Sequence, residues 1–278
     1  MSVDSFYLFL CAFGASCFGG ILGMASGIFI VPLLTVVLKV ELPVAIATSA
    51  ISVIACSCAG ASTYLKARLT NFRLAMVLEV ATTLGAFTGV VLIGVLSIKA
   101  LSLLFCLILF ISAIQMFMNR TERAYGAMDK NSWGAKLALQ GQYSDGSNRE
   151  VKYHIHNLPL GMFLMYLAGV LSTLLGIGSG VLKIPAMDTA LRLPLKVSSA
   201  TSNFMIGVTA ASGAAAYFVK GAIVPSVVGP VVIGSVLGAF LGAKVLVKFS
   251  SNKLRYLFIT ILILLGMQML FKVWNGDL

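Results

Sequence analysis

Charged side chains are scarce in this chain. Only 10% of its 278 residues are Asp, Glu, Lys or Arg, whereas a typical soluble domain has about 25%. Hydrophobic residues make up 59% of the chain and form long uninterrupted runs. A water-soluble fold cannot bury that much apolar surface, so a lipid bilayer must solvate most of it. Because the runs do not alternate with polar residues, they indicate transmembrane helices and exclude a β-barrel.

Acidic residues are the scarcer charged type, nine against twenty Lys and Arg, which gives a net charge of +11. The sequence nevertheless lacks a basic stripe with interleaved aromatic residues, so nucleic acid is not an expected partner. The basic residues stand singly at the ends of apolar runs, where they face lipid headgroups and fix orientation. The N-terminus lacks a positive region before its first apolar run, so no cleaved signal peptide is expected.

Residues for catalysis or metal binding are also few. The two histidines, His154 and His156, lie in a polar loop, where an ordinary loop pair is favoured over a metal site because no cysteine or carboxylate cluster is near. The glycines at 176, 178 and 180 lack the strand–helix context of a dinucleotide site. Five cysteines lie inside apolar runs and indicate neither a disulfide framework nor a ligand set. We therefore expect no enzyme activity, no metal and no cofactor.

The apolar runs divide the chain into two halves. They cover residues 6–38, 45–65, 74–98, 100–118, 158–191, 197–219, 226–248 and 254–273. The one long polar stretch, 119–157, separates the fourth run from the fifth, and its end at Gln142–His156 reads as a small hairpin. We predict a first transmembrane repeat at 1–118, a polar loop at 119–157 and a second repeat at 158–278.

The two halves match at a constant offset of 153 positions. Proline, tyrosine, glycine and an Ala-Thr-Ser triplet all recur at this spacing, as in Pro32/Pro185, Tyr64/Tyr217, Gly27/Gly180, Ser26/Ser179 and Thr48/Thr201. Chance matching of common membrane residues does not explain these types together. Internal duplication is typical of secondary transporters, whose binding site lies at the repeat interface.

The first run of each half is too long for one crossing. A straight helix over 6–38 or 158–191 would be about 50 Å long, against a hydrocarbon core of about 30 Å. Glycines and a proline cluster in the middle of each run, and these residues weaken or break helices. We predict two short helices joined by a break inside the membrane; the alternative is one long tilted helix with glycines used for packing.

The distribution of basic residues distinguishes these readings. Single crossings place eleven Lys and Arg on the side of the central loop and eight opposite. If each long run is a hairpin, the numbers become fifteen and four, which obeys the positive-inside rule far better. The predicted fold is thus an all-α integral membrane protein with two inverted-topology repeats. Each has a broken, hairpin first helix followed by three transmembrane helices, and the central loop is cytoplasmic.

The two breaks are the strongest candidates for a site. A helix that starts inside the membrane exposes backbone N–H groups that bind anions, and Ser26 and Ser179 add hydroxyl donors. In an inverted arrangement the breaks enter from opposite faces and are expected to meet near the midplane. The following helices add further donors within apolar stretches, with interhelical packing as the alternative role: Thr48, Ser49, Thr201, Ser202 and Asn203.

Three charged residues lie at membrane depth, where a charged side chain is costly and usually has a function. Lys183 is a candidate to neutralise an anion; alternatively it reaches a headgroup or pairs with Asp188. Glu79 is a candidate proton carrier, or a partner of Arg73 or Lys66 near the interface. Asp188 is the second acid considered for proton coupling.

The duplicated motifs resemble the signature of the TauE/SafE sulfite-exporter family. They read Gly23-Met-Ala-Ser-Gly27, Pro32 and Ala47-Thr48-Ser49 in the first half, and Gly176-Ile-Gly-Ser-Gly180, Pro185 and Ala200-Thr201-Ser202-Asn203 in the second. The resemblance implies export of sulfite, sulfoacetate or a related organosulfur anion. It also implies a substrate site at Ser26, Gly27, Thr48, Ser49, Ser179, Gly180, Thr201, Ser202 and Asn203. The family pattern often has three glycines where this chain has Ala25-Ser26-Gly27 and Gly178-Ser179-Gly180, so the exact anion stays open.

The sequence as a whole predicts a secondary transporter that exports sulfite or a small organosulfonate across a bacterial or archaeal cell membrane by alternating access. Protons, the membrane potential or both are the candidate driving forces. The alternatives are an anion channel or importer for another small anion, and a membrane scaffold that binds a protein through the 119–157 loop. The oligomeric state is not predicted.

Overall fold

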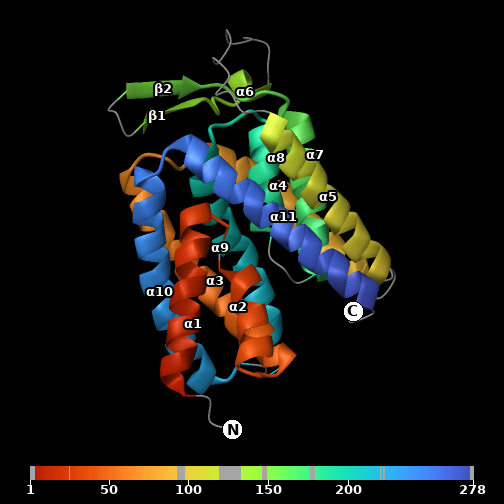
Figure 1. The fold of residues 1–278 in the computed structure, drawn as a ribbon. Coiled ribbons are helices and arrows are strands. Elements are labelled where there is room, and N and C mark those ends of the chain that lie inside the picture. Colours follow the sequence, from red (N-terminus) through yellow and green to blue (C-terminus); the bar gives the residue numbers. More distant parts are fainter. Residues whose placement is uncertain are drawn as a thin grey trace. The chain divides into compact units, whose positions relative to one another are not determined.

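The computed structural model describes residues 4–24, 26–92, 98–118, 133–145, 149–175, 179–219, 221 and 223–275, and these are almost entirely helical (Figure 1). The chain forms two compact units. Unit 1 comprises Met1–Thr70 and Ser199–Lys248, and unit 2 comprises Asn71–Ser198 and Phe249–Leu278. Each unit combines helices from both sequence halves. The compact bodies therefore do not coincide with the predicted division at 118 and 158.

Unit 1 is purely helical within its described residues. The Ser5–Leu22 helix is continuous, whereas the next segment is a short helix that ends in a π-helical turn directly after Pro32. Proline donates no backbone hydrogen bond, which accounts for the loss of regular helix at this point. The elements are α1 (Ser5–Leu22), α2 (Gly27–Pro32), η1 (Leu33–Val37), α3 (Leu42–Lys66), α9 (Leu195–Val219) from Ser199 onward, and α10 (Pro225–Lys248).

The first long run reverses direction in unit 1. Leu8 of α1, Ile30 of α2 and Leu34 of η1 belong to one buried apolar cluster. In a continuous helix Leu8 and Leu34 would be about 39 Å apart, since each residue adds 1.5 Å. The chain therefore folds back after Leu22, as predicted, and the alternative of one long tilted helix is wrong.

Unit 2 contains the polar hairpin as well as helices. Its helices include three of 21 or 25 residues, and the second long run again forms two pieces. The elements are α4 (Phe72–Leu92), α5 (Ile98–Met118), α6 (Trp133–Lys136), β1 (Gly141–Asp145), β2 (Arg149–Tyr153), α7 (Leu158–Leu175), α8 (Gly180–Thr189) and α11 (Ser251–Asn275).

The second long run also returns to the end from which it starts. His156, just before α7, donates its backbone N–H to the carbonyl of Leu191, just after α8, at 3.3 Å. Gly161 in the first turn of α7 lies against the Leu191 side chain. The two outer ends of α7 and α8 are thus adjacent, which confirms a hairpin. Gly176 and Gly178, which the sequence placed at its break, lie outside the described residues.

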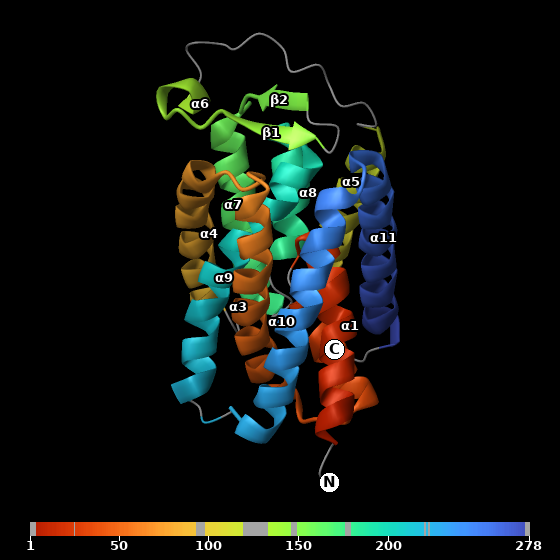
Figure 2. The same cartoon turned by 90° about the vertical axis from the view of Figure 1, so that its left-hand side faces the viewer.

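The predicted hairpin in the central loop is present. β1 and β2 pair antiparallel, with Gly141 opposite Tyr153 and Asp145 opposite Arg149. Figure 2 shows it at the end of unit 2 where α7 begins. It is anchored there because Asn71, at the start of α4, donates its side-chain amide to the Leu139 carbonyl at 2.8 Å and to the Tyr153 hydroxyl at 3.1 Å. The described part of the loop is therefore integral to unit 2.

Equivalent glycines mediate the tightest helix contacts of both units. In unit 1, α10 runs parallel to α1, and a Cβ at Gly238 would overlap the Phe13 carbonyl oxygen. In unit 2, α4 runs parallel to α7, and a Cβ at Gly85 would overlap the Tyr166 carbonyl oxygen. The offset of 153 relates Gly85 to Gly238 and Phe13 to Tyr166. The duplicated positions thus make the same contact, each time between a helix of one half and a helix of the other.

Within the described ranges, four helices are long and apolar enough to cross a membrane: Ser5–Leu22, Pro43–Lys66, Phe72–Gly89 and Pro225–Lys248. Two shorter apolar helices, Cys106–Met118 and Leu158–Thr173, lie within other predicted runs. Many large apolar side chains on these helices face outward, including Phe87, Val91 and Phe163. Outward apolar faces are what lipid contact requires, so the protein is a multi-pass membrane protein.

Candidate functional site

The break in unit 1 is built around a left-handed glycine. Gly23 ends α1 with φ of 69° and donates its backbone N–H to the Gly19 carbonyl. It also packs so closely on the backbone of Ser199 that a Cβ would clash there. Both requirements, positive φ and close approach, are met only by glycine. The tight turn places Ser26 at the start of α2.

Ser26 is a buried hydroxyl that has no hydrogen-bond partner. Its φ and ψ are −74° and −9°, and its carbonyl accepts the N–H groups of Phe29 and Ile30 at 3.0 and 2.9 Å. The side chain is 0% exposed, and its oxygen makes no hydrogen bond although the Cys56 thiol is close by. An unsatisfied hydroxyl in an apolar interior costs about 1–3 kcal/mol. This atom is therefore available to a ligand.

The Ala-Thr-Ser segment of α3 lies beside this break. Ser49 donates to the Gly27 carbonyl at 3.5 Å, and a Cβ at Gly27 would come within 3.2 Å of the Ser49 hydroxyl oxygen. Thr48 is 0% exposed and its hydroxyl lacks a partner. Ser49 and Gly27 thus lie side by side within unit 1, and the role of Ser26, Gly27, Thr48 and Ser49 in binding a substrate stays a prediction.

The second polar segment in unit 1 comes from α9. Asn203 donates its side-chain amide to the Ser57 carbonyl at 3.1 Å, and Ser57 donates its hydroxyl to the Asn203 carbonyl at 2.5 Å. The Asn203 side-chain oxygen and the Ser202 hydroxyl are buried without hydrogen bonds, and Thr201 is 0% exposed. Asn203 therefore ties α9 to α3 through its amide nitrogen and leaves its oxygen unsatisfied.

The break in unit 2 repeats the geometry of the first. Ser179 begins α8 with φ and ψ of −77° and −11°, is 2% exposed, and has a hydroxyl without a hydrogen-bond partner. Its carbonyl accepts the backbone N–H of Lys183 at 3.0 Å. Gly180 follows as the first helical residue and is buried. Ser26 and Ser179, which the sequence offset equates, thus share conformation, burial and a missing partner.

Lys183 forms the most deeply buried ion pair of the described residues. Its ammonium lies 3.0 Å from Glu79 Oε2 of α4, and the exposed fractions of the two side chains are 0% and 9%. The sequence suggested Asp188 as a partner for Lys183, and Arg73 or Lys66 for Glu79. The structure instead joins these two residues to each other across unit 2.

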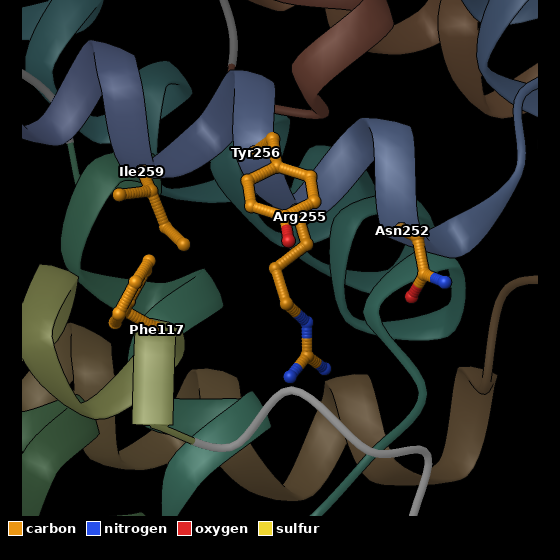
Figure 3. A pocket seen from close by; sticks show the side chains of 5 residues that line it. All are labelled: Phe117, Asn252, Arg255, Tyr256 and Ile259. Carbon is orange, nitrogen blue, oxygen red and sulfur yellow. The ribbon is translucent and has the colours of Figure 1, made fainter.

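Asp188 has a different partner. Its carboxylate accepts from the Arg255 guanidinium at 3.2 Å. Arg255 also lines a pocket of about 210 Å³ between the end of α5 and the start of α11 (Figure 3). Its other lining residues are Phe117, Asn252, Tyr256 and Ile259. Lys183 and Ser179 are not among the lining residues, so this pocket is separate from the break in unit 2.

The predicted site residues divide between the two units. Seven lie in unit 1: Ser26, Gly27, Thr48, Ser49, Thr201, Ser202 and Asn203. The other five lie in unit 2: Ser179, Gly180, Lys183, Glu79 and Asp188. The meeting of the two breaks near the midplane stays a prediction.

Several contacts in these regions were missed by the sequence reasoning. Ser57 was not singled out because the 153 offset places Ala210 opposite it, so duplication gave no signal. Tyr64 was noted only as a repeat marker, yet its hydroxyl donates to the Gly20 carbonyl near the first break. The match of Tyr64 with Tyr217 in the sequence was the signal that Tyr64 has a structural role.

Burial shifts the pKa of two groups at the end of the polar hairpin, Tyr153 and His156. Burial raises the pKa of Tyr153, and the hydrogen bond from Asn71 opposes that shift. Burial lowers the pKa of His156, and the charges of Arg192 and His154 act in the same direction. Within the described ranges no three His, Cys, Asp or Glu side chains are grouped to hold a metal ion.

Comparison with known proteins places the chain in a family. The model of the family described as "Sulfite exporter TauE/SafE" matches residues 8–269. The chain is also 23% identical over 261 residues to the probable membrane transporter protein YunE of Bacillus subtilis (strain 168), covering 91% of this chain and 93% of that protein. No solved structure matches. The match spans both units and both breaks, and the chain belongs to the TauE/SafE sulfite exporter family.

Proposed function

We propose that the protein is a secondary transporter that exports sulfite or a small organosulfonate from the cytoplasm of a bacterial or archaeal cell by alternating access. The family description supports a sulfur oxyanion as substrate. The name of the Bacillus subtilis relative, a probable membrane transporter, supports transport over enzymatic or scaffold roles. The hairpin of the central loop is bonded through Asn71 to its own unit, which supports a structural role for it.

One observation carries the proposal: Ser26 and Ser179 are equivalent, buried and without hydrogen-bond partners. A single orphaned hydroxyl is a tolerable defect. Two at positions related by the sequence duplication, each at the start of a helix inside a membrane segment, are a conserved design of the fold's two copies. A donor that the protein itself leaves unpaired is satisfied when a ligand with acceptor oxygens binds.

The chemistry of the donors fits a sulfur oxyanion. Sulfite and sulfonates present several strong acceptor oxygens and no donor, and each of the two break regions, taken by itself, offers hydrogen-bond donors. In unit 1 these are Ser26, Thr48, Ser49, Thr201, Ser202 and Asn203, with Gly27 allowing close backbone approach. In unit 2, Ser179 and Gly180 are joined by Lys183, one helical turn further along α8. Hydrogen bonds to a charged ligand contribute about 1.5–3 kcal/mol each, which is enough for selective binding.

The proposed orientation places the central loop in the cytoplasm. Lys152, Arg192 and Lys253 lie at one end of unit 2, together with the β-hairpin and the outer ends of α7 and α8. Basic residues favour the cytoplasmic side. The hairpins in both units and the equivalent glycine contacts support two inverted repeats, in which each compact unit is assembled from pieces of both.

The proposal is tested by efflux of sulfite from proteoliposomes and by binding of sulfite and sulfoacetate to purified protein. Wild type is expected to show saturable efflux. The Ser26→Ala/Ser179→Ala variant is expected to bind at least about tenfold more weakly, because one or two charge-assisted hydrogen bonds are lost. The control is Ser62→Ala/Thr260→Ala, which removes two exposed hydroxyls that bond only within their own helices.

Three results would overturn the proposal. The first is saturable movement of acetate or chloride with no response to any sulfur oxyanion, which would favour a carrier for another anion. The second is normal binding by the Ser26→Ala/Ser179→Ala variant, which would move the site away from the breaks. Conductance that does not saturate with sulfite concentration would indicate a channel.

A further inference from the structure

The ion pair between Lys183 and Glu79 is unusual for its depth. Lys183 is one of the largest side chains that the structure buries completely, and Glu79 keeps only 9% of its side chain exposed. Removing two charges from water costs several kcal/mol per ion, and the mutual attraction repays this only with good geometry. Such pairs inside membrane proteins are retained mainly for function.

The duplication supplies an internal control for this pair. The 153 offset equates Lys183 with Ile30 and Glu79 with Val232. In unit 1, Ile30 is 1% exposed and belongs to an apolar cluster that includes Val231. Val232 itself is half-buried, so unit 1 carries aliphatic side chains at both of the equivalent positions. The fold does not require charges at these positions, so the pair in unit 2 needs a functional explanation.

The position of the pair links it to the proposed anion site. Lys183 lies one turn from Ser179 on α8, and its backbone N–H bonds the Ser179 carbonyl at 3.0 Å. The Ser179 hydroxyl is 2% exposed and unpartnered. A buried cation and an unsatisfied donor on the same face of the helix start suit an oxyanion. The carboxylate of Glu79, on α4, already lies against the Lys183 ammonium as an anion would.

We propose that Glu79 is a tethered counter-anion for Lys183 that the transported oxyanion displaces, and that the displaced carboxylate takes up a proton. This inference rests on the proposed transport function and identifies its coupling ion. In the empty protein the ammonium is neutralised by Glu79. When the anion arrives it accepts from the Lys183 ammonium, and a proton from the bulk solution adds to a Glu79 carboxylate oxygen. The net charge of the buried site is therefore the same with and without a monoanion, and a dianion adds one negative charge instead of two.

The proton is needed because a carboxylate cannot stay ionised in an apolar site without its cation. Other titratable groups on the packed helices are engaged elsewhere. Tyr166 of α7 donates to Thr88, the Cys106 thiol of α5 donates to the Gly266 carbonyl, Asp188 of α8 pairs with Arg255 of α11, and Arg73 at the start of α4 is exposed. Among the described side chains, Glu79 is the carboxylate in contact with Lys183.

The coupling has a consequence for the driving force. A proton that moves with the anion lowers the net negative charge that crosses the membrane by one elementary charge. A dianion would still leave a cell with a net negative charge and so be driven outward by an inside-negative potential, which contributes about 2.3 kcal/mol per charge at 100 mV. A monoanion would be moved without net charge. Under this coupling the membrane potential therefore drives the export of a dianion and not that of a monoanion.

The test measures protons taken up on binding. Sulfoacetate is fully ionised at neutral pH, so any proton taken up in a weakly buffered, dye-monitored titration goes to the protein. Wild type is expected to take up about one proton per anion bound, with affinity falling about tenfold per pH unit above neutrality. Glu79→Gln keeps the shape of the side chain without its charge. It is expected to bind at least as tightly, with no proton uptake and no pH dependence.

The outcomes separate this inference from the transport proposal. Glu41→Gln is the matched control, since Glu41 is exposed and makes no side-chain cap hydrogen bond, and its proton uptake is expected to equal wild type. Binding by wild type without proton uptake overturns the inference while the transport proposal stands. Proton uptake by Glu79→Gln equal to that of wild type also overturns the inference, because a group other than Glu79 then binds the proton. If neither sulfite nor sulfoacetate binds wild type, both proposals fail.

Discussion

Gly238 of α10 lies directly against the carbonyl oxygen of Phe13 on α1, so closely that no side chain fits between the two backbones. Small residues at helix contacts let membrane helices approach and pack where no hydrophobic force drives them together. The equivalent pair in unit 2, Gly85 and Tyr166, shows that the duplication preserved the contact and not only the residue type.

Replacing Gly238 by alanine is expected to destabilise unit 1. The added Cβ would come under 3.0 Å from backbone atoms of α1, which cannot yield as a flexible side chain would. Overpacking of this kind costs about 1–3 kcal/mol. We expect a lower midpoint of thermal unfolding in detergent for Gly238→Ala. Gly14→Ala is the control, because the position has no neighbouring atom within 4 Å; an equal loss there would show that the effect is not due to the close contact.

This interface illustrates what the sequence could and could not predict. The 153 offset identified Gly85 and Gly238 as equivalent, and runs of apolar residues located the helices to within a few positions. The partners of these glycines lie some 80 and 225 residues away and carry no distinguishing side chain, since the contact is made by backbone carbonyls. The grouping of helices from both halves into one compact unit was therefore not predictable from periodicity.

Replacing both members of the ion pair by apolar residues is expected to preserve the fold. Lys183→Met alone leaves a buried carboxylate and Glu79→Leu alone leaves a buried ammonium. Removing one partner of a buried pair costs about 3–5 kcal/mol. The double variant imitates Ile30 and Val232 of unit 1 and should unfold near the wild-type temperature, with anion binding lost. Thermal unfolding of wild type, the two single variants and the double variant gives the coupling energy between Lys183 and Glu79. A double variant as unstable as the single variants would contradict this account.

The same pair shows the limit of the sequence for the site. Intramembrane charges were recognisable one by one, because charge is rare in apolar runs. Lys183 and Glu79 are separated by 104 positions, and no local rule connects them. The sequence offered Asp188 and Arg73 as partners because they are nearer in the chain. Helix packing decided otherwise, and it also joined Asp188 to Arg255, 67 positions away.

The attachment of the polar hairpin is expected to weaken in acid. The folded protein disfavours a proton on His156, so the pKa of that imidazole lies below its ordinary value of 6.5. The unfolded segment binds the proton more readily than the folded one. The contribution of His156 to the stability of the folded segment is therefore complete above pH 6.5, and it falls as the pH drops through that value toward the lower folded pKa. Amide hydrogen exchange of the backbone around 153–157 should accelerate on going from pH 7 to pH 5.5, after correction for the intrinsic pH effect.

A His156→Gln variant supplies the comparison for this experiment. Its side chain does not titrate, so the extra acceleration in acid should disappear, while the backbone bond from residue 156 to Leu191 is retained. If the variant keeps the full pH response, another group is responsible.

Cysteine labelling from the two sides of the membrane tests the hairpin topology most directly at Arg192. The bond between His156 and Leu191 places Arg192 at the same end of unit 2 as the β-hairpin. With the central loop in the cytoplasm, Arg192→Cys and Lys152→Cys, each in a background without the five native cysteines, should react with an impermeant maleimide only in inside-out vesicles. Glu41→Cys, beyond the first hairpin, should react in intact cells. A straight crossing of residues 158–191 would instead put Arg192 and Lys152 on opposite sides, and labelling of Arg192→Cys in intact cells alone would establish that arrangement.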